Sequence, residues 1–199
     1  MHYFTSQPLT QTHPLAVELA GARRELLSAP GVFSADRLDP GTRVLLDHLP
    51  AELPAGGVVV DVGAGWGPLA LTAALTYPGA HVLAVDVNQA ARELTAANAR
   101  RLGVDVHVAT PEGGLAWLDG RGIDLIVSNP PIRVGKDALH QILATWLPLL
   151  SDDGAAYLVI AKNLGADSHQ KWIASELGLE CDRLGSSKGY RVLQVRRPQ

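Results

Sequence analysis

Asn129-Pro130-Pro131 is the stretch of this chain whose residue types are most specific to one chemistry. It follows an apolar run over 123–128 that predicts a buried strand. A residue before proline is restricted to extended backbone, and proline has no N–H to donate. We therefore expect the Asn129 amide to project from the strand end beside a free backbone carbonyl, where the two oxygens can accept both hydrogens of a planar NH2 group. The tripeptide alone is equally compatible with a tight turn.

A glycine loop earlier in the chain favours the chemical interpretation. Residues 58–62 predict a strand, and Pro68 suits the first turn of a following helix. The spacing is Gly-x-Gly-x-Gly, whereas a dinucleotide site has Gly-x-Gly-x-x-Gly. Asp61 before the glycines would repel a pyrophosphate and favour a cationic amino acid, such as the methionine end of S-adenosylmethionine. The residues expected to hold that ligand are Asp61, Gly63, Ala64, Gly65 and Trp66.

A second acid ends the next predicted strand, over 80–86. Asp86 lies 23 residues after Gly63, where an acid typically binds the ribose hydroxyls of a nucleoside. This position serves NAD and S-adenosylmethionine equally, so it does not separate them. With its neighbour Val87, Asp86 is expected to contact the nucleoside; the alternative is that Asp86 only caps the helix that follows.

Strands and helices alternate through most of the chain, which predicts an α/β fold with a parallel sheet covered on both faces. Residues 179–184 and 190–196 flank a Gly-Ser-Ser-Lys-Gly turn and predict a hairpin, which adds an antiparallel strand. We expect strands over 58–62, 80–86, 104–109, 123–128 and 155–161, and helices over 68–77, 88–102, 136–148 and 166–177. Earlier in the chain we expect helices over 12–28 and 42–49 and a linker over 50–57.

The composition is that of one globular domain. A chain of 199 residues with 47% hydrophobic and 19% charged residues can bury one sizeable core. We expect a single domain over 1–199, with an N-terminal extension over 1–50 and a catalytic core over 57–199. The net charge of −3 argues against a domain that binds nucleic acid mainly through its overall charge. Residues 160–199 nevertheless have a local positive surplus, with seven Lys/Arg against four Asp/Glu.

Several absences in the sequence exclude other classes of protein. The single Cys181 excludes an internal disulfide, and no apolar run approaches the 18 residues of a membrane span. The N-terminus lacks a basic-then-apolar signal pattern, and the histidines form no cluster with metal-ligand spacing. We expect a soluble cytoplasmic protein that binds no metal.

Taken together, residues 61–65, Asp86 and the Asn-Pro-Pro stretch resemble class I S-adenosylmethionine-dependent methyltransferases that act on amines. Residues 30–34, 39–46, 2–4 and 188–192 extend the resemblance, over nearly the whole chain, to ribosomal RNA small-subunit methyltransferase C and its small-domain relatives. The resemblance implies a Rossmann-like, seven-stranded sheet whose last strand is antiparallel. It also implies guanine N2 of 16S ribosomal RNA as acceptor, with the RNA or the small ribosomal subunit as partner.

The resemblance also implies roles for individual residues. Thr110 and Pro111 lie where the adenine of the cofactor usually sits, although a plain loop is nearly as compatible there. Asn129 and the Pro130 carbonyl would bind the acceptor NH2 and line it up with the methyl group. Phe33 would cover the cofactor or the acceptor base, unless it belongs to the core.

The chain departs from the family pattern at two points. Ile132 stands where relatives carry an aromatic residue that can stack on the target base, a contact worth ~1–3 kcal/mol. The bacterial ribosomal enzyme that the chain resembles has an additional N-terminal domain, and we expect no counterpart of that domain here. We expect RNA docking to depend on the N-terminal extension, on the basic C-terminal face or on a partner.

Other functions stay open from the sequence. The Asn-Pro-Pro motif does not separate guanine N2 from adenine N6 in DNA or tRNA, or from a protein glutamine side chain. An NAD-dependent oxidoreductase is disfavoured by Asp61 and the glycine spacing. A protein with the cofactor fold that binds RNA or a partner without catalysis is disfavoured because Asn129 and Asp61 are both present.

Overall fold

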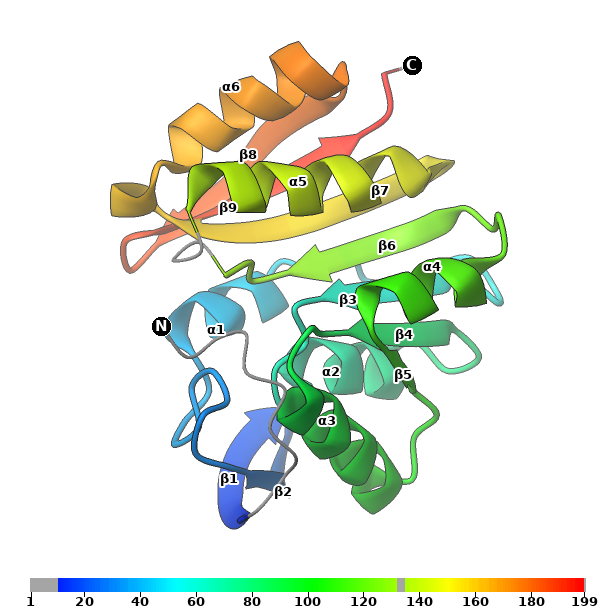
Figure 1. The fold of residues 1–199 in the computed structure, drawn as a ribbon, viewed down its shortest axis with the longest axis vertical. Coiled ribbons are helices and arrows are strands. Elements are labelled where there is room, and N and C mark those ends of the chain that lie inside the picture. The colour runs from blue at the N-terminus through cyan, green and yellow to red at the C-terminus, as the bar shows by residue number, and fades with distance from the viewer. Residues whose placement is uncertain (1–10, 132–134, 199) are drawn as a thin grey trace.

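A seven-stranded sheet forms the centre of the molecule in the computed structural model, which describes residues 11–131 and 135–198 (Figure 1). The strand order is β5-β4-β3-β6-β7-β9-β8. The strands are β3 (Val58–Val62), β4 (His81–Val85), β5 (His107–Ala109), β6 (Ile123–Ser128), β7 (Leu150–Ala161), β8 (Glu180–Ser187) and β9 (Tyr190–Arg196). The five strands from β5 to β7 are parallel neighbours, and β9 is antiparallel to both β7 and β8. The predicted mostly parallel sheet with an antiparallel last strand is confirmed.

The chain changes direction within the sheet between β3 and β6. From β3 it runs outward through β4 to β5, and it then returns to the other side of β3 to form β6. In open α/β sheets, ligands bind at such a switch point, outside the carboxyl ends of the strands. The glycine loop after β3 and the Asn-Pro-Pro stretch after β6 both lie at this point.

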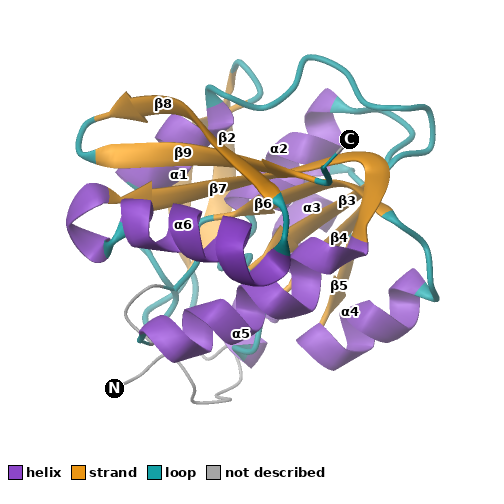
Figure 2. Cartoon of the chain, turned by 90° about the horizontal axis from the view of Figure 1, so that it is seen from above, coloured by secondary structure: helices purple, strands orange, loops and turns teal. Residues whose placement is uncertain are grey.

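Helices cover both faces of the sheet, as the sequence predicts (Figure 2). The helices α1 (Pro40–Leu46), α2 (Pro68–Thr76) and α3 (Gln89–Leu102) pack on one face. The helices α4 (Pro111–Leu118), α5 (Lys136–Trp146) and α6 (Ala166–Leu177) pack on the other. Two short 3-10 turns, η2 (Leu147–Leu149) and η3 (Lys162–Leu164), flank β7.

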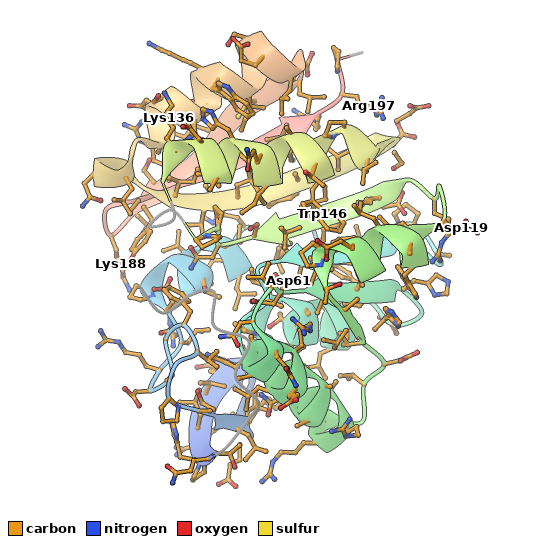
Figure 3. The ribbon with its side chains drawn as sticks, in the orientation of Figure 1. Asp61, Asp119, Lys136, Trp146, Lys188 and Arg197 are labelled. Atoms are coloured by element: carbon orange, nitrogen blue, oxygen red, sulfur yellow. The ribbon has the colours of Figure 1, made fainter. Side chains whose placement is uncertain are left out.

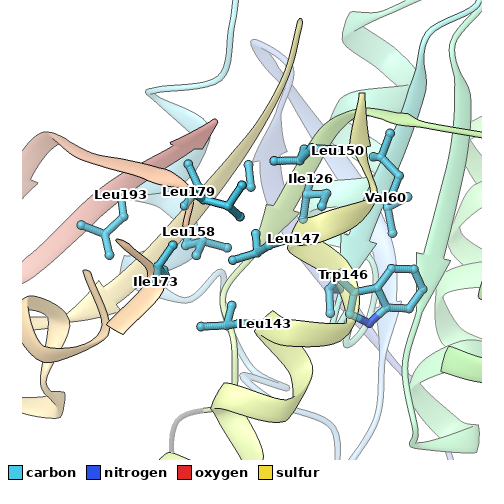
Figure 4. Close-up of a cluster of buried hydrophobic side chains, with 14 of the residues drawn as sticks. Val60, Ile126, Leu143, Trp146, Leu147, Leu150, Leu158, Ile173, Leu179 and Leu193 are labelled. Atoms are coloured by element: carbon cyan, nitrogen blue, oxygen red, sulfur yellow. The ribbon is translucent and has the colours of Figure 1, made fainter. Parts of the chain in front are cut away.

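Side chains of β3 point alternately to the two faces of the sheet, so this one strand contributes to two apolar clusters. Val58, Val60 and Val62 belong to the cluster that α5 and α6 cover, and Figure 4 shows Val60 in that cluster with Trp146 of α5. Val59 belongs to the opposite cluster, under α1 and α2. Because successive strand residues point to opposite faces, Asp61 points to the same side as Val59, into a layer that is otherwise apolar.

The predicted helix over 12–28 is wrong. These residues form an antiparallel hairpin, β1 (His13–Leu19) and β2 (Ala22–Ser28), with positive φ at Ala20 and Gly21. Buried Leu15, Val17 and Leu19 recur every second residue, which is the period of a strand. The Ala, Leu, Glu and Arg content suggested a helix, but the two-residue turn and the alternating pattern prevail. The hairpin packs on α2 and α3 through a third apolar cluster.

Other differences concern element boundaries and one missed helix. α1 begins at Pro40 rather than at residue 42 because Asp39 caps it, and it ends at Leu46 rather than at 49. Between the predicted strands over 104–109 and 123–128 no element is expected, but the structure has α4 there, a helix that contains the adjacent Gly113 and Gly114. β5 begins only at His107, and β7 begins five residues earlier than expected. The turn of the last hairpin is 188–189 rather than 185–189, since both residues adopt the positive φ of a two-residue turn.

Candidate active site

The glycine loop between β3 and α2 folds back against the end of β4. Gly63 and Gly65 have φ of 84° and 60°, a region that favours glycine. A Cβ on Gly65 would meet no atom within 4 Å, so the glycine is required by backbone conformation and not by lack of space. The N–H groups of Gly63 and Ala64 donate to the Val85 carbonyl at 2.9 and 3.1 Å. The loop is therefore fixed by backbone contacts.

Asp61 lies buried behind this loop, with none of its surface exposed. Its Oδ2 accepts from the Ala70 N–H in α2 at 2.9 Å, whereas its Oδ1 has no hydrogen-bond partner among the described residues. Burial raises the pKa of Asp61 to about 7, the Ala70 N–H lowers it, and the charge of Asp86 raises it further. The side chain does not line the cavity described below, so direct contact with a cofactor stays a prediction.

Asp86 connects the end of β4 to the glycine loop. Its Oδ2 accepts from the Gly65 N–H at 2.9 Å and its Oδ1 from the Asn88 N–H at 2.8 Å. Burial raises its pKa, and these two N–H groups and Arg92 lower it in part. The helix-cap alternative is wrong, because Asn88 caps α3 by accepting from the N–H of Ala90. The position and charge of Asp86 suit a nucleoside hydroxyl.

Asn129 reaches toward α1 from the end of β6. Its Nδ2 donates to Oδ1 of Asp39 at 2.8 Å and to Oγ1 of Thr42 at 3.0 Å. The next prolines bring this stretch against the glycine loop: a Cβ on Gly63 would lie 3.8 Å from Cδ of Pro131. The loop after β3 and the loop after β6 are thus direct neighbours, as the strand order predicts.

A cavity lies between these two loops. It is lined by the glycine loop over 63–66, by Asp39 and Thr42 of the α1 region, by Phe33, and by Asn129. The Phe33 side chain is 45% exposed, so it is available to a ligand and is not a core residue. The cavity joins the glycine loop, expected to hold part of a cofactor, to Asn129, expected to hold an acceptor, whereas Asp61 and Asp86 are not among its lining residues.

Trp66 supports the cavity wall from within. It is 1% exposed, and its Nε1 donates to the Ser34 carbonyl at 3.3 Å. The buried Asn98 of α3 donates to the carbonyls of Trp66 and Leu27 and accepts from the Leu27 N–H. These contacts attach the β1–β2 hairpin and the loop carrying Phe33 to the glycine loop.

The predicted cofactor residues Val87, Thr110 and Pro111 are not among the residues that line the cavity. Thr110 caps α4, its Oγ1 accepting from the Gly113 N–H at 3.1 Å, and Pro111 is the first residue of that helix. Val87 is 52% exposed beyond the end of β4. Ile132 lies outside the described residues, so its contact with an acceptor base stays a prediction. Val87, Thr110 and Pro111 follow the carboxyl ends of parallel strands, on the same edge as the cavity.

Sequence reasoning missed Asp39 and Thr42 as site residues. Asp39 followed by proline is a signal for a helix start, and the structure confirms that Asp39 caps α1 by accepting from the Thr42 N–H at 3.0 Å. Nothing in one sequence connects that helix start to Asn129, which lies 90 residues later.

Residues 11–131 and 135–198 contain no group of three or more His, Cys, Asp or Glu side chains placed to hold a metal ion. Over the same ranges, no helix has the length and apolar content needed to cross a membrane.

Comparisons with known proteins agree with the geometry. A family model described as methyltransferase small domain matches residues 23–194. An uncharacterised protein of Bacillus subtilis (strain 168), YbxB, is 29% identical over 98% of both chains. Ribosomal RNA large subunit methyltransferase G of Pseudomonas fluorescens (strain Pf0-1) is 32% identical over 96% of this chain. Ribosomal RNA small subunit methyltransferase C of Pseudomonas paraeruginosa is 34% identical over 92% of it.

Among solved structures, a T. Thermophilus 16S rRNA N2 methyltransferase in complex with AdoMet and guanosine superimposes with a TM-score of 0.81 and 25% identity. The match covers 95% of this chain and 51% of the other. The chain likewise spans about half the length of the relatives named for ribosomal RNA, at 51% and 54%. The expected Rossmann-like methyltransferase fold is confirmed.

Proposed function

The chain belongs to the methyltransferase small domain family, and from this membership we propose that it methylates an exocyclic amine, the N2 amine of a guanine in 16S ribosomal RNA. S-Adenosylmethionine is the methyl donor. The observation that carries the proposal is that Asn129 and the glycine loop line one cavity. An amide oxygen suited to an NH2 group therefore lies beside the place suited to the donor.

The residues present fit S-adenosylmethionine better than a dinucleotide. The cofactor carries positive charge and ribose hydroxyl donors, and this part of the site offers the carboxylates Asp61 and Asp86. The buried Asp61 Oδ1 has no donor among the described residues, and an ammonium group or a water bound to it would supply one. A pyrophosphate at the glycine loop would face Asp61, whereas Asp86 suits the ribose of either ligand. Asp61, Asp86 and the 63–66 loop would hold the cofactor, which supplies an electrophilic methyl group when bound.

The acceptor residues act by alignment. Asn129 Oδ1 and the Pro130 carbonyl would each accept one hydrogen of the acceptor NH2, which turns the nitrogen lone pair away from both oxygens and toward the methyl donor. The same two oxygens stabilise the positive charge that develops on nitrogen. The methylated amine then releases its proton readily, so the site requires no strong general base.

Ribosomal RNA as the acceptor is supported by the names of the relatives and by exposed lysines that follow β6 and β7 or precede β9, at one end of the sheet. Lys136, Lys162 and Lys188 are exposed, and among the described residues none of them forms an ion pair. The Lys162 N–H donates to the Gly189 carbonyl at 2.9 Å, which places η3 beside the β8–β9 turn. Figure 3 shows Lys136 and Lys188 on the same side of the molecule. Such lysines suit contacts with RNA phosphates.

We extend the proposal to the whole chain as one methyltransferase domain acting in the cytoplasm, where its ribosomal substrate is found. Under this proposal, residues before position 50 help to bind the acceptor, because Phe33, Asp39 and Thr42 all line the cavity.

The test is transfer of labelled methyl groups from S-adenosylmethionine to 30S subunits, naked 16S RNA, 50S subunits, tRNA and DNA, with Asn129→Ala as the control. We expect transfer to 30S subunits or 16S RNA. Transfer to 50S subunits alone would indicate that the acceptor is in the large subunit, the subunit for which other relatives are named. Transfer to tRNA or DNA alone would indicate adenine N6, and transfer to a ribosomal protein would indicate glutamine. RNA binding without transfer would indicate the non-catalytic alternative.

A further inference from the structure

The orientation of the Asn129 amide decides what this cavity can accept. The oxygen and the NH2 of an asparagine side chain are nearly alike in shape but opposite in hydrogen bonding. If the oxygen faces the cavity, the side chain accepts hydrogens from an amine. If the NH2 faces it, the side chain donates to a carbonyl oxygen or a ring nitrogen instead.

The hydrogen-bond partners of the Asn129 amide determine its orientation. Asp39 Oδ1, 2.8 Å from the Asn129 amide, also accepts from the Thr42 N–H at 3.0 Å. A carboxylate offers acceptors only, so the NH2 end of Asn129 must face Asp39. Reversing the amide would place two acceptor oxygens against each other. Thr42 Oγ1, at 3.0 Å, occupies the second hydrogen of the NH2, which leaves Oδ1 as the atom free for a ligand.

The two partners are themselves held firmly. Asp39 caps α1, and Thr42 is only 3% exposed. The start of α1 packs tightly under Tyr190 of β9, because a Cβ on Gly41 would lie 2.8 Å from Cε1 of that ring. The Arg43 N–H donates to the Asp39 carbonyl at 2.9 Å. The amide of Asn129 is therefore oriented before any acceptor arrives.

We propose that Asp39 and Thr42 are positioning residues that lock the Asn129 amide with its oxygen toward the acceptor. Their contacts make the site selective for an NH2 group over a carbonyl oxygen. This inference rests on the proposed function and deepens it, since it assigns the selection of an amine to residues outside the Asn-Pro-Pro stretch.

A purely mechanical role is the alternative to exclude. The same two hydrogen bonds join α1 to the end of β6, so their loss would also loosen the fold. Two matched pairs of variants separate the roles. Thr42→Val removes the hydroxyl and keeps the branched shape, whereas Thr42→Ser keeps the hydroxyl. Asp39→Ser retains a capping oxygen but is too short to reach Asn129, whereas Asp39→Asn retains an oxygen for both donors.

The readout is the affinity for three nucleosides, measured by ligand-detected NMR with adenosylhomocysteine present. Guanosine and adenosine carry an exocyclic NH2, and inosine carries none. We expect the wild-type chain to bind guanosine about tenfold more tightly than inosine, which is the size of one or two hydrogen bonds. Thr42→Val and Asp39→Ser should bring this ratio close to one. Thr42→Ser and Asp39→Asn should keep it, and all four variants should bind adenosylhomocysteine as the wild type does.

The outcomes distinguish this inference from the proposed function. If Thr42→Val and Asp39→Ser keep the wild-type ratio, or if the wild-type chain shows no preference for either amine over inosine, the positioning role is overturned. If the wild type prefers adenosine over inosine and the variants abolish that preference, the positioning role stands and the guanine assignment fails. Should Asp39→Ser not fold, the Thr42 pair alone decides.

Discussion

The cofactor side of the cavity joins residues that are near in sequence, whereas the acceptor side joins residues that are far apart. On the cofactor side, the glycine loop lies between Asp61 and Asp86, which are 25 positions apart. This region is held by backbone N–H groups that bond to the buried Asp61, to the half-buried Asp86 and to the Val85 carbonyl. The acceptor side joins Asn129 to Asp39, 90 residues earlier, through contacts between side chains. Because the two sides are held by different contacts, we expect a mutation on one side to change cofactor binding or acceptor selection without changing the other.

Asn129→Ala gives the largest effect and tests that separation. Losing a preorganised polar group in an active site typically lowers turnover by ~10²–10³. The affinity for adenosylhomocysteine, measured by calorimetry, should stay nearly unchanged, because the glycine loop contacts Asp86 and Val85 rather than Asn129. Near-normal turnover on the true acceptor would show that Asn129 does not align the amine.

Asp86→Ala is the matching change on the cofactor side. A hydrogen bond to a charged group contributes ~1.5–3 kcal/mol, so adenosylhomocysteine affinity should fall roughly 10- to 100-fold. Melting without ligand should fall only modestly, as the Gly65 and Asn88 N–H groups lose a shared partner. An unchanged affinity together with a lower melting temperature would limit Asp86 to fastening the loop.

Asp61 gives the cofactor side a dependence on pH. Its pKa in the folded chain is about 7, against an ordinary value of 3.8, so the folded state holds a proton that the unfolded state has released. Its contribution to stability is complete below pH 3.8 and is lost as pH rises to about 7. Thermal melting without ligand should show this decline in the wild type, and Asp61→Asn should reduce it.

The affinity for S-adenosylmethionine should change with pH in the opposite direction. A cationic ligand favours the ionised carboxylate, so binding should strengthen as pH rises through about 7. Calorimetry at pH 6 and pH 8 with the wild type and Asp61→Asn is the measurement. Equal pH dependence in both proteins would assign the effect to another group.

Ile132→Phe gives the smallest effect and belongs to the acceptor side. An aromatic residue after the second proline could stack on a base, with a gain of ~1–3 kcal/mol at most. We expect several-fold tighter acceptor binding without any change in adenosylhomocysteine affinity. Loss of activity would indicate a site narrower than a stacked purine, and the guanine assignment would then be abandoned first.

The sequence could predict that the glycine loop lies beside the ends of β3 and β4, because the signals for this arrangement are local. Gly63, Gly65 and the acids at the ends of successive strands are spaced as in a site that binds a nucleoside cofactor. The Ala, Leu, Glu and Arg content of residues 12–28 favours a helix, and only the alternation of buried residues at every second position indicates the β1–β2 hairpin. The contact of Asn129 with Asp39 could not be predicted, since it depends on the crossover that returns the chain from β5 to β6 beside β3.

The central claim is that the acceptor atom is an exocyclic nitrogen, N2 of guanine. The most direct measurement is to treat 16S RNA or 30S subunits with the chain and S-adenosylmethionine, digest the RNA to nucleosides, and identify the methylated product by chromatography and mass spectrometry. We predict N2-methylguanosine, formed ~10²–10³ times more slowly when Asn129→Ala replaces the wild type. A methyl group on a ring nitrogen, on a carbonyl oxygen or on a ribose hydroxyl would contradict the account.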